Sequence, residues 1–242
     1  MSWRRPVRLM ARRIARHRGY DVVEYPAPDL RRRLKLMRHF NIDLVLDVGA
    51  DTGEYVEQLR RHGYTGRVVS FEPLAGSFAR LCAAAADDPR WQVLNLALGE
   101  RDGVAMLHVA ANAHSSSLRA ILPAHLDAAP QSGSVGAQEV QMRRLAPIFA
   151  EYRGDAHSIY LKIDVQGAER EVLTGAAESL PHITGVQLEL SLLPLYAGQV
   201  LMPEMQALMA QHGFALMSLE PGFTDPRTGR LLQVDGVFFR PT

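Results

Sequence analysis

The fold is decided by residues 44–55, which read Leu44-Val45-Leu46-Asp47-Val48-Gly49-Ala50-Asp51-Thr52-Gly53-Glu54-Tyr55. Apolar residues surround one acid, and two glycines four positions apart follow before a helical pattern begins. A continuous apolar run is typical of a buried parallel strand, and glycine lets the following turn come close to a ligand. The stretch therefore predicts a strand, a glycine turn and a helix.

A second apolar run, residues 67–71, ends in Glu72-Pro73. Glu72 follows Asp47 by 25 positions and stands at the carboxyl end of this second strand. In a doubly wound sheet, an acid at that position can bind the ribose hydroxyls of a nucleotide that lies over the first turn. We therefore predict a nucleotide-containing cofactor.

The glycine turn separates two classes of cofactor. A dinucleotide fold uses G-x-G-x-x-G, so that a pyrophosphate rests on the helix N-terminus. Here Asp51 stands two positions after Gly49, where the pyrophosphate would approach. An acidic turn favours a cationic ligand, and S-adenosylmethionine carries a sulfonium and an ammonium group. We predict S-adenosylmethionine, and a nicotinamide-dependent dehydrogenase is the disfavoured alternative. A protein of this fold that binds without catalysing is the other alternative.

Composition sets the outer limits. The chain has 242 residues, 47% of them hydrophobic, which is enough for one α/β domain with a full core. The single cysteine, Cys82, excludes an internal disulfide and is predicted to be a packed core thiol. No run approaches the length of a membrane span, and no signal-peptide h-region is present. We expect a soluble, cytoplasmic protein.

Residues 1–41 are predicted to form a basic helical leader that precedes the domain of residues 42–242. Residues 1–18 hold seven arginines and no acid, so the net charge of +1 leaves about −6 for the rest. This balance argues against extended nucleic-acid binding. Val7, Met10 and Ile14 share one helical face opposite four arginines, a pattern of membrane-surface helices. A solvated cap and a transit peptide are the alternatives.

Hydrophobic periodicity predicts the remaining elements. Helices are expected at 29–40, 54–62, 75–86, 168–177 and 203–212, and strands at 44–48, 67–71, 91–96, 104–109, 140–145, 159–163, 185–190, 214–219 and 236–240. Residues 110–138 are rich in Ala, Ser, Gly and Pro, and a connection this long is usually functional or disordered. We predict a substrate lid there, with His114 and His125 as exposed lid histidines.

A second informative block covers residues 159–169. It is another apolar strand, ends in Asp164 and opens through Gly167 onto a helix. Ligands bind beyond the carboxyl ends of the strands, where the strand order reverses. We therefore expect Asp47, Glu72 and Asp164 to converge there.

The chain resembles the FkbM family of S-adenosylmethionine-dependent methyltransferases over roughly residues 42–240. The resemblance rests on blocks at 47–53, 71–73, 95–99, 115–118, 162–169 and 235–239, and on Glu189. It implies a class I (Rossmann-like) methyltransferase fold: a seven-stranded, mostly parallel sheet with its last strand antiparallel and helices on both faces. It also implies O-methylation of hydroxyl groups, often on sugars or natural products, and here we expect a glycolipid or other glycosylated acceptor. Asp51 departs from the family's usual Asn, and Gln166 from a frequent Glu.

The predicted donor site comprises Asp47, Gly49, Ala50, Asp51, Gly53, Glu72, Pro73, Asn95 and Ala97. For the chemistry we expect direct transfer of the methyl group to an oxygen whose proton a base removes. Asp164 is the first candidate for that base and His114 the second. Lys162, one of only two lysines, lies on the same side of its strand as Asp164 and is a third candidate catalytic residue. A divalent metal held by Asp164 and Glu189 is conceivable, although no ligand spacing requires it.

Overall fold

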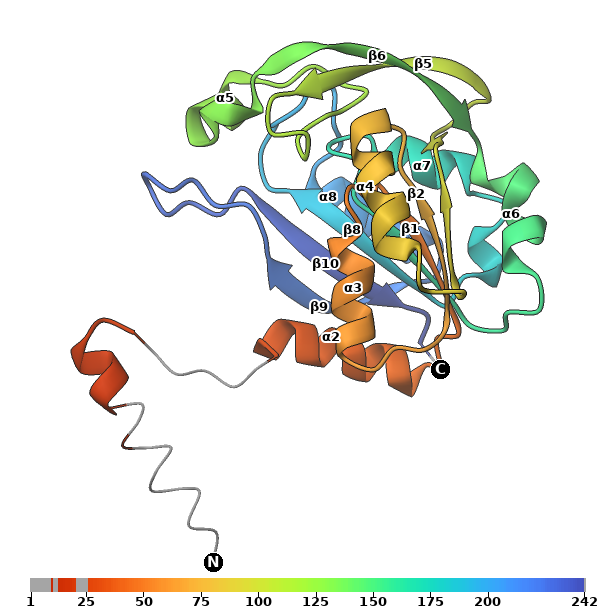
Figure 1. Ribbon diagram of the computed structural model, residues 1–242, viewed down its shortest axis with the longest axis horizontal. Helices are drawn as coiled ribbons and strands as arrows, with labels where there is room; N and C mark the ends of the chain where they lie inside the picture. The colour runs from red at the N-terminus through yellow and green to blue at the C-terminus, as the bar shows by residue number, and fades with distance from the viewer. Residues whose placement is uncertain (1–9, 11–12, 21–25, 242) are drawn as a thin grey trace, which may run out of the picture.

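The computed structural model describes residues 10, 13–20 and 26–241, and its centre is a seven-stranded sheet (Figure 1). The strands lie in the order β3-β2-β1-β7-β8-β10-β9. Their bounds are Leu44–Val48 for β1, Arg67–Phe71 for β2, Trp91–Leu94 for β3, Ile159–Ile163 for β7, Gly185–Ser191 for β8, Ala215–Pro221 for β9 and Gln233–Phe239 for β10. Only β10 pairs in an antiparallel manner, with β8 and with β9. This is the class I methyltransferase sheet that the sequence predicts.

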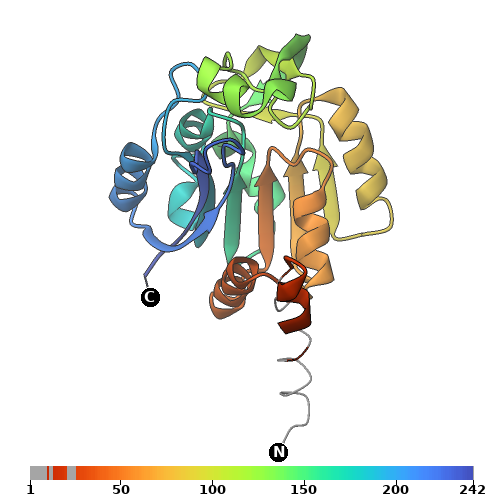
Figure 2. The same cartoon turned by 90° about the vertical axis from the view of Figure 1, so that its left-hand side faces the viewer.

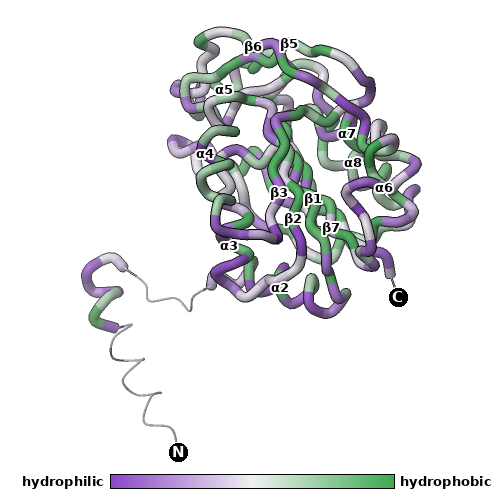
Figure 3. The backbone as a smooth tube through the Cα atoms, turned by 45° about the vertical axis from the view of Figure 1, so that its right-hand side comes forward, coloured by the Kyte–Doolittle hydropathy of each residue, from purple (hydrophilic) through white to green (hydrophobic). Residues whose placement is uncertain are grey.

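Helices cover both faces of this sheet (Figure 2). One face carries α2 (Pro28–His39), α3 (Glu54–Arg61) and α4 (Ala75–Ala85), and the other carries α6 (Leu145–Arg153), α7 (Glu169–Gly175) and α8 (Met202–Gln211). Alternate residues of β1 enter opposite cores, because Val45 packs with α2 and α3 while Leu44 and Leu46 pack with α6 and α7. The central strands β1 and β7 are accordingly buried throughout and mostly hydrophobic (Figure 3).

A second, three-stranded sheet lies over the carboxyl ends of the central strands (Figures 1 and 2). It is formed by β4 (Ala97–Leu98), β6 (Ser134–Arg143) and β5 (Gly103–Ala110), in that order. Between β5 and β6 the chain forms α5 (Pro123–Ala128) and the short 3₁₀ helix η1 (Pro130–Ser132); η2 (Leu180–His182) follows α7 elsewhere in the chain. The opposite end of the sheet, where the parallel strands begin, is crossed by α2.

The expected short strand at 140–145 is wrong in its bounds. β6 begins at Ser134 and runs for ten residues, because its polar first half pairs with β5 instead of being buried. A helix that was not predicted, α6, begins at Leu145 and buries Leu145, Phe149 and Tyr152. These three residues have helical spacing, so the sequence did contain the signal.

The predicted lid is a folded segment. Arg119 pairs with Glu171 at the start of α7, and the amide of Leu122 donates to the carbonyl of Leu195. His125 is buried instead of exposed, and its Nε2 lies 3.1 Å from Ser132 Oγ. Burial lowers the pKa of His125.

The single cysteine, Cys82, is only half-buried, so the expected core thiol lies at the edge of the core.

Most of the predicted leader helix lies outside the described residues. Within the described part, residues 13–17 are helical, and the side chains of Met10 and Ile14 are exposed. No helix among the described residues is long and apolar enough to cross a membrane.

Candidate active site

The glycine turn after β1 is held against the end of β7. Gly49 has φ +76°, and a Cβ atom there would lie 1.8 Å from the carbonyl oxygen of Asp164. No side chain fits at that distance, so glycine is required because the ends of two strands meet. The amides of Gly49 and Ala50 donate to the carbonyl of Phe71 at 3.0 and 3.2 Å. Gly53, with φ +94°, ends the turn and caps α3.

Glu72 links the second strand to the glycine turn. Its Oε2 accepts a hydrogen bond from the amide of Asp51 at 2.8 Å, and its Oε1 accepts one from the amide of Leu74 at 2.8 Å. Burial raises the pKa of Glu72 to about 7, although these two amides oppose the shift. Each carboxylate oxygen keeps a second lone pair, which a ligand hydroxyl can use.

Asp51 connects the turn to the lid and to α4. Its Oδ2 lies 2.6 Å from His114 Nδ1, and its Oδ1 accepts a hydrogen bond from Ser77 Oγ at 2.7 Å. Asp51 has φ +46°, a conformation that aspartate tolerates better than most residues. The His114 side chain is two-thirds exposed and comes from the lid. The contact therefore closes one side of the site.

Asp47 and Lys162 form a buried pair beneath the turn. They are register partners on β1 and β7, and Lys162 Nζ lies 3.1 Å from Asp47 Oδ1. Nζ also donates to the carbonyl of Gly49 at 2.9 Å and lies 3.6 Å from Asp164 Oδ2. Burial opposes the charge on Lys162, but Asp47 and Asp164 outweigh it and raise its pKa. A lysine that stays charged in this way cannot act as a base.

The side chain of Asp164 follows β7 and is bound by Gln166. The side-chain nitrogen of Gln166, Nε2, donates to Asp164 Oδ1 at 2.8 Å and to Glu189 Oε2 at 2.9 Å. Burial raises the pKa of Glu189 well above its ordinary value, and the charge of Asp164 adds to the shift. Burial likewise raises the pKa of Glu169 to about 7, although the amides of Gly167 and Val165 donate to it.

These groups surround a cleft at the carboxyl ends of β1, β2 and β7. Its volume is about 780 Å³ when the open mouth is included. Of the predicted site residues, seven line it: Gly49, Asp51, Glu72, Pro73, Ala97, His114 and Asp164. Ser77, Ser116 and Gln166 line it as well and were not predicted. Ser116 lies in a block that carried the family resemblance, so it had a signal, whereas Ser77 had none.

The other predicted residues act around the cleft instead of lining it. Asp47 and Lys162 lie beneath the turn, and Ala50 and Gly53 shape it. Asn95 donates through its amide to the carbonyls of Glu72 and Pro73, at 2.9 and 3.0 Å. Asn95 thus fixes the bend that presents Glu72. In the described part of the chain, no three His, Cys, Asp or Glu side chains are grouped so as to hold a metal ion.

The family profile described as the methyltransferase FkbM domain matches residues 47–216. The chain belongs to the FkbM methyltransferase family. The match begins at Asp47 and includes the glycine turn, Glu72 and Asp164. The resemblance read from the sequence is therefore confirmed, and the protein is a methyltransferase by family.

Several solved structures are similar to this chain, and three of them carry methyltransferase names. The FkbM methyltransferase of Methylobacillus flagellatus KT is 14% identical with a TM-score of 0.46, over 81% of this chain and 44% of that one. Magnesium protoporphyrin IX methyltransferase of Synechocystis PCC 6803, solved with bound S-adenosylmethionine, is 12% identical with a TM-score of 0.48, over 100% and 98%. An rRNA methylase of Streptococcus thermophilus is 8% identical with a TM-score of 0.49, over 90% and 100%. No curated protein matches this FkbM chain significantly.

Proposed function

We propose that this FkbM protein transfers a methyl group from S-adenosylmethionine to a hydroxyl group, on a sugar of a glycolipid or of another glycosylated product. The observation that carries the proposal is the meeting of Glu72, Asp51 and Asp164 around one cleft at the switch point of the sheet. Family membership supports methyl transfer, and the acidic lining supports a cationic donor.

The residues present fit S-adenosylmethionine. Glu72 has free lone pairs for the ribose hydroxyls, and Pro73 with Leu96 offers an apolar wall for the adenine. Gly49 allows close approach of the donor to the backbone, and the carboxylates of Asp51 and Asp164 favour its positive groups. When bound, the donor supplies an electrophilic methyl group.

Asp164 is the base in this proposal. Its carboxylate is about one-third exposed and borders the cleft, so an acceptor hydroxyl can reach it. Lys162 and Gln166 hold it from two sides, which fixes the direction in which it accepts a proton. His114 is the second candidate, but its Nδ1 is already engaged by Asp51. Lys162 takes the role of positioning the turn and Asp164 by its charge.

The test is methyl transfer from isotopically labelled S-adenosylmethionine to a panel of glycolipids, their soluble head groups and hydroxylated natural products. Calorimetry with S-adenosylhomocysteine and with NAD is run beside it. We expect binding of S-adenosylhomocysteine and transfer to at least one sugar hydroxyl. Binding of NAD without a response to S-adenosylhomocysteine would sink the donor assignment. Donor binding without transfer to any acceptor would instead favour the non-catalytic alternative.

A further inference from the structure

The side-chain amide of Gln166 stands between the carboxylates of Asp164 and Glu189. One nitrogen, Nε2, donates to Asp164 Oδ1 at 2.8 Å and to Glu189 Oε2 at 2.9 Å. A primary amide has two N–H groups, so these two contacts use its whole donor capacity. The neutral amide thereby supplies one hydrogen bond to each of the two acids.

The orientation of this amide is fixed by its other end. The hydroxyl of Tyr196 donates to Gln166 Oε1 at 2.6 Å, so the oxygen is held away from the acids. The backbone is held as well, because Ser117 Oγ in the lid donates to the carbonyl of Gln166 at 2.6 Å. Gln166 also adopts φ +56°, which is unusual for a residue other than glycine, asparagine or aspartate. Four neighbours therefore determine where Nε2 lies.

The residues around Asp164 and Glu189 do not fit a site for a metal ion. Asp164 and Glu189 supply two oxygens, but the oxygens that face each other already accept hydrogen bonds from the same nitrogen. Glu189 Oε2 accepts a second hydrogen bond, from Gln233 Nε2 at 2.7 Å. A hard cation would have to bind to the oxygen lone pairs that these hydrogen bonds already use, and an N–H group that points at a cation repels it.

We propose that Gln166 is a positioning residue whose amide takes the place of a bridging cation between Asp164 and Glu189, so that Asp164 faces the cleft without a metal. The inference rests on the proposed function in so far as Asp164 is the base, but the contacts themselves do not depend on the acceptor. It goes further by assigning a role to Gln166, to Tyr196 and to Glu189. A glutamate at position 166 would place three carboxylates together and create a cation site.

The experiment uses the full chain and Mn²⁺ alone as the probe. In Gln166→Glu, an oxygen replaces Nε2 and Tyr196 can still donate to the remaining oxygen. We expect this variant to bind one Mn²⁺ with a Kd of about 1 mM or tighter, in the range of weak carboxylate sites. Its melting temperature should then rise by about 3–5 °C in 10 mM Mn²⁺. The wild-type protein should show neither effect.

Gln233→Glu is the matched control. It makes the same chemical change beside the same oxygen of Glu189, yet Gln233 has no hydrogen bond to Asp164. It should therefore gain no comparable Mn²⁺ affinity. The double variant Gln166→Glu with Glu189→Gln keeps the new carboxylate at position 166 but removes the carboxylate of Glu189. We expect it to lose the Mn²⁺ effect, because fewer carboxylates remain to hold the cation.

Two results would overturn the proposal. One is Mn²⁺ binding by the wild-type protein that Asp164→Asn abolishes. The other is a double variant that keeps the Mn²⁺ effect without the carboxylate of Glu189, and this arm decides the question even if Gln166→Glu alone does not fold. S-adenosylhomocysteine is titrated into the same wild-type preparation. Failure to bind it refutes the proposed function, whereas donor binding with no Mn²⁺ gain in Gln166→Glu refutes only the role of Gln166.

Discussion

Replacing Glu72 by glutamine should remove most of the pH dependence of donor binding between pH 6 and pH 8. The wild-type pKa of about 7 means that about 9% of Glu72 is ionised at pH 6 and about 91% at pH 8. A ribose hydroxyl donates more strongly to the ionised form. Because apparent affinity scales with the competent fraction, S-adenosylhomocysteine should bind about tenfold more tightly at pH 8.

Calorimetry at each pH, in two buffers with different heats of ionisation, measures both the affinity and the protons released. At pH 6, binding should release close to one proton from Glu72, and at pH 8 very little. The Glu72→Gln variant has no proton to release at this position, so it also measures any titration of the ligand itself. At pH 8 the variant should bind about ten- to a hundredfold more weakly than the wild type, from the loss of one or two charge-assisted hydrogen bonds. An affinity of the wild-type protein that stays constant from pH 6 to 8 would refute the reasoning.

The same carboxyl group affects stability with a definite sign. Its pKa is higher in the folded protein, about 7, than the ordinary 4.5, so between these values the folded state binds more protons than the unfolded state. Stability of the donor-free protein therefore falls as pH rises from about 4.5 to about 7. Glu169, with a pKa also near 7, contributes in the same direction.

Three further predictions concern single side chains. Gly49→Ala should destabilise the whole domain and not only block the donor, because its Cβ would lie 1.8 Å from the Asp164 carbonyl oxygen; thermal melting of the purified variant measures this. Lys162→Met should leave Asp47 buried without its counter-charge and lower the free energy of unfolding by about 3–5 kcal/mol, so a urea titration that matches wild type contradicts the buried pair. Asp164→Asn should lower kcat by about 10²–10⁴ while donor affinity stays within a few-fold, and a comparable loss in His114→Ala alone would reverse the two roles.

The sequence alone predicts the sheet because its signals are local. Residues 44–53 specify a buried strand and a turn, and the acid after β2 could be assigned to the same edge from strand order alone. The pairing of Asp47 with Lys162 was not predictable in this way. It depends on β1 and β7 being neighbours with these two residues in register, and they lie 115 positions apart. A predicted donor-site acid and a candidate catalytic lysine are thus a buried support for the turn.

The structure of the lid, in contrast, was not predictable from the sequence. Its composition predicted a long functional or disordered connection, but its polar residues hydrogen-bond to one another: the hydroxyls of Ser115 and Ser132 lie 2.9 Å apart, and both lie near His125 Nε2. Such a network depends on residues that are 7 to 17 positions apart and that meet only in the folded segment. Periodicity detects apolar faces and cannot register it. For the same reason the sequence named Gln166 only as a departure from glutamate and did not predict its role, because its partners come from β8, the loop after β8 and the lid.

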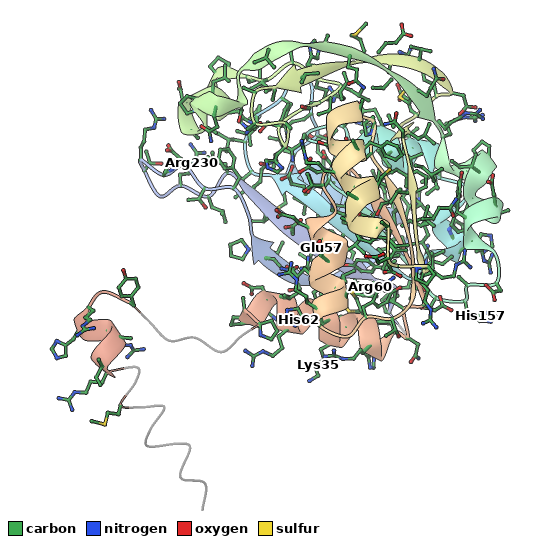
Figure 4. The ribbon with its side chains drawn as sticks, in the orientation of Figure 1. Lys35, Glu57, Arg60, His62, His157 and Arg230 are labelled. Atoms are coloured by element: carbon green, nitrogen blue, oxygen red, sulfur yellow. The ribbon has the colours of Figure 1, made fainter. Side chains whose placement is uncertain are left out.

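Membrane contact through the basic N-terminal residues is a proposal, and the fold determines how far the cleft would then lie from the membrane. We propose that residues 3–18 contact an anionic membrane surface; the part of them that the structure describes includes Met10 and Ile14, whose side chains are 67% and 53% exposed. α2 follows residues 3–18 in the chain and crosses the end of the sheet opposite the cleft, and Lys35 on α2 points away from the domain there (Figure 4).

Deleting residues 1–18 should release the protein from anionic vesicles and leave S-adenosylhomocysteine affinity unchanged. Each arginine near such a surface contributes about 1 kcal/mol, reduced by salt. β1 spans roughly 16 Å and a helix is about 10 Å thick, so a domain seated on its α2 end would hold the cleft roughly 25 Å above the lipid. A glycolipid with a long head group should then be methylated in vesicles, whereas one with a short head group should react only in detergent. Full-length protein that stays in the supernatant with anionic vesicles at moderate salt would remove the membrane contact and this length dependence together.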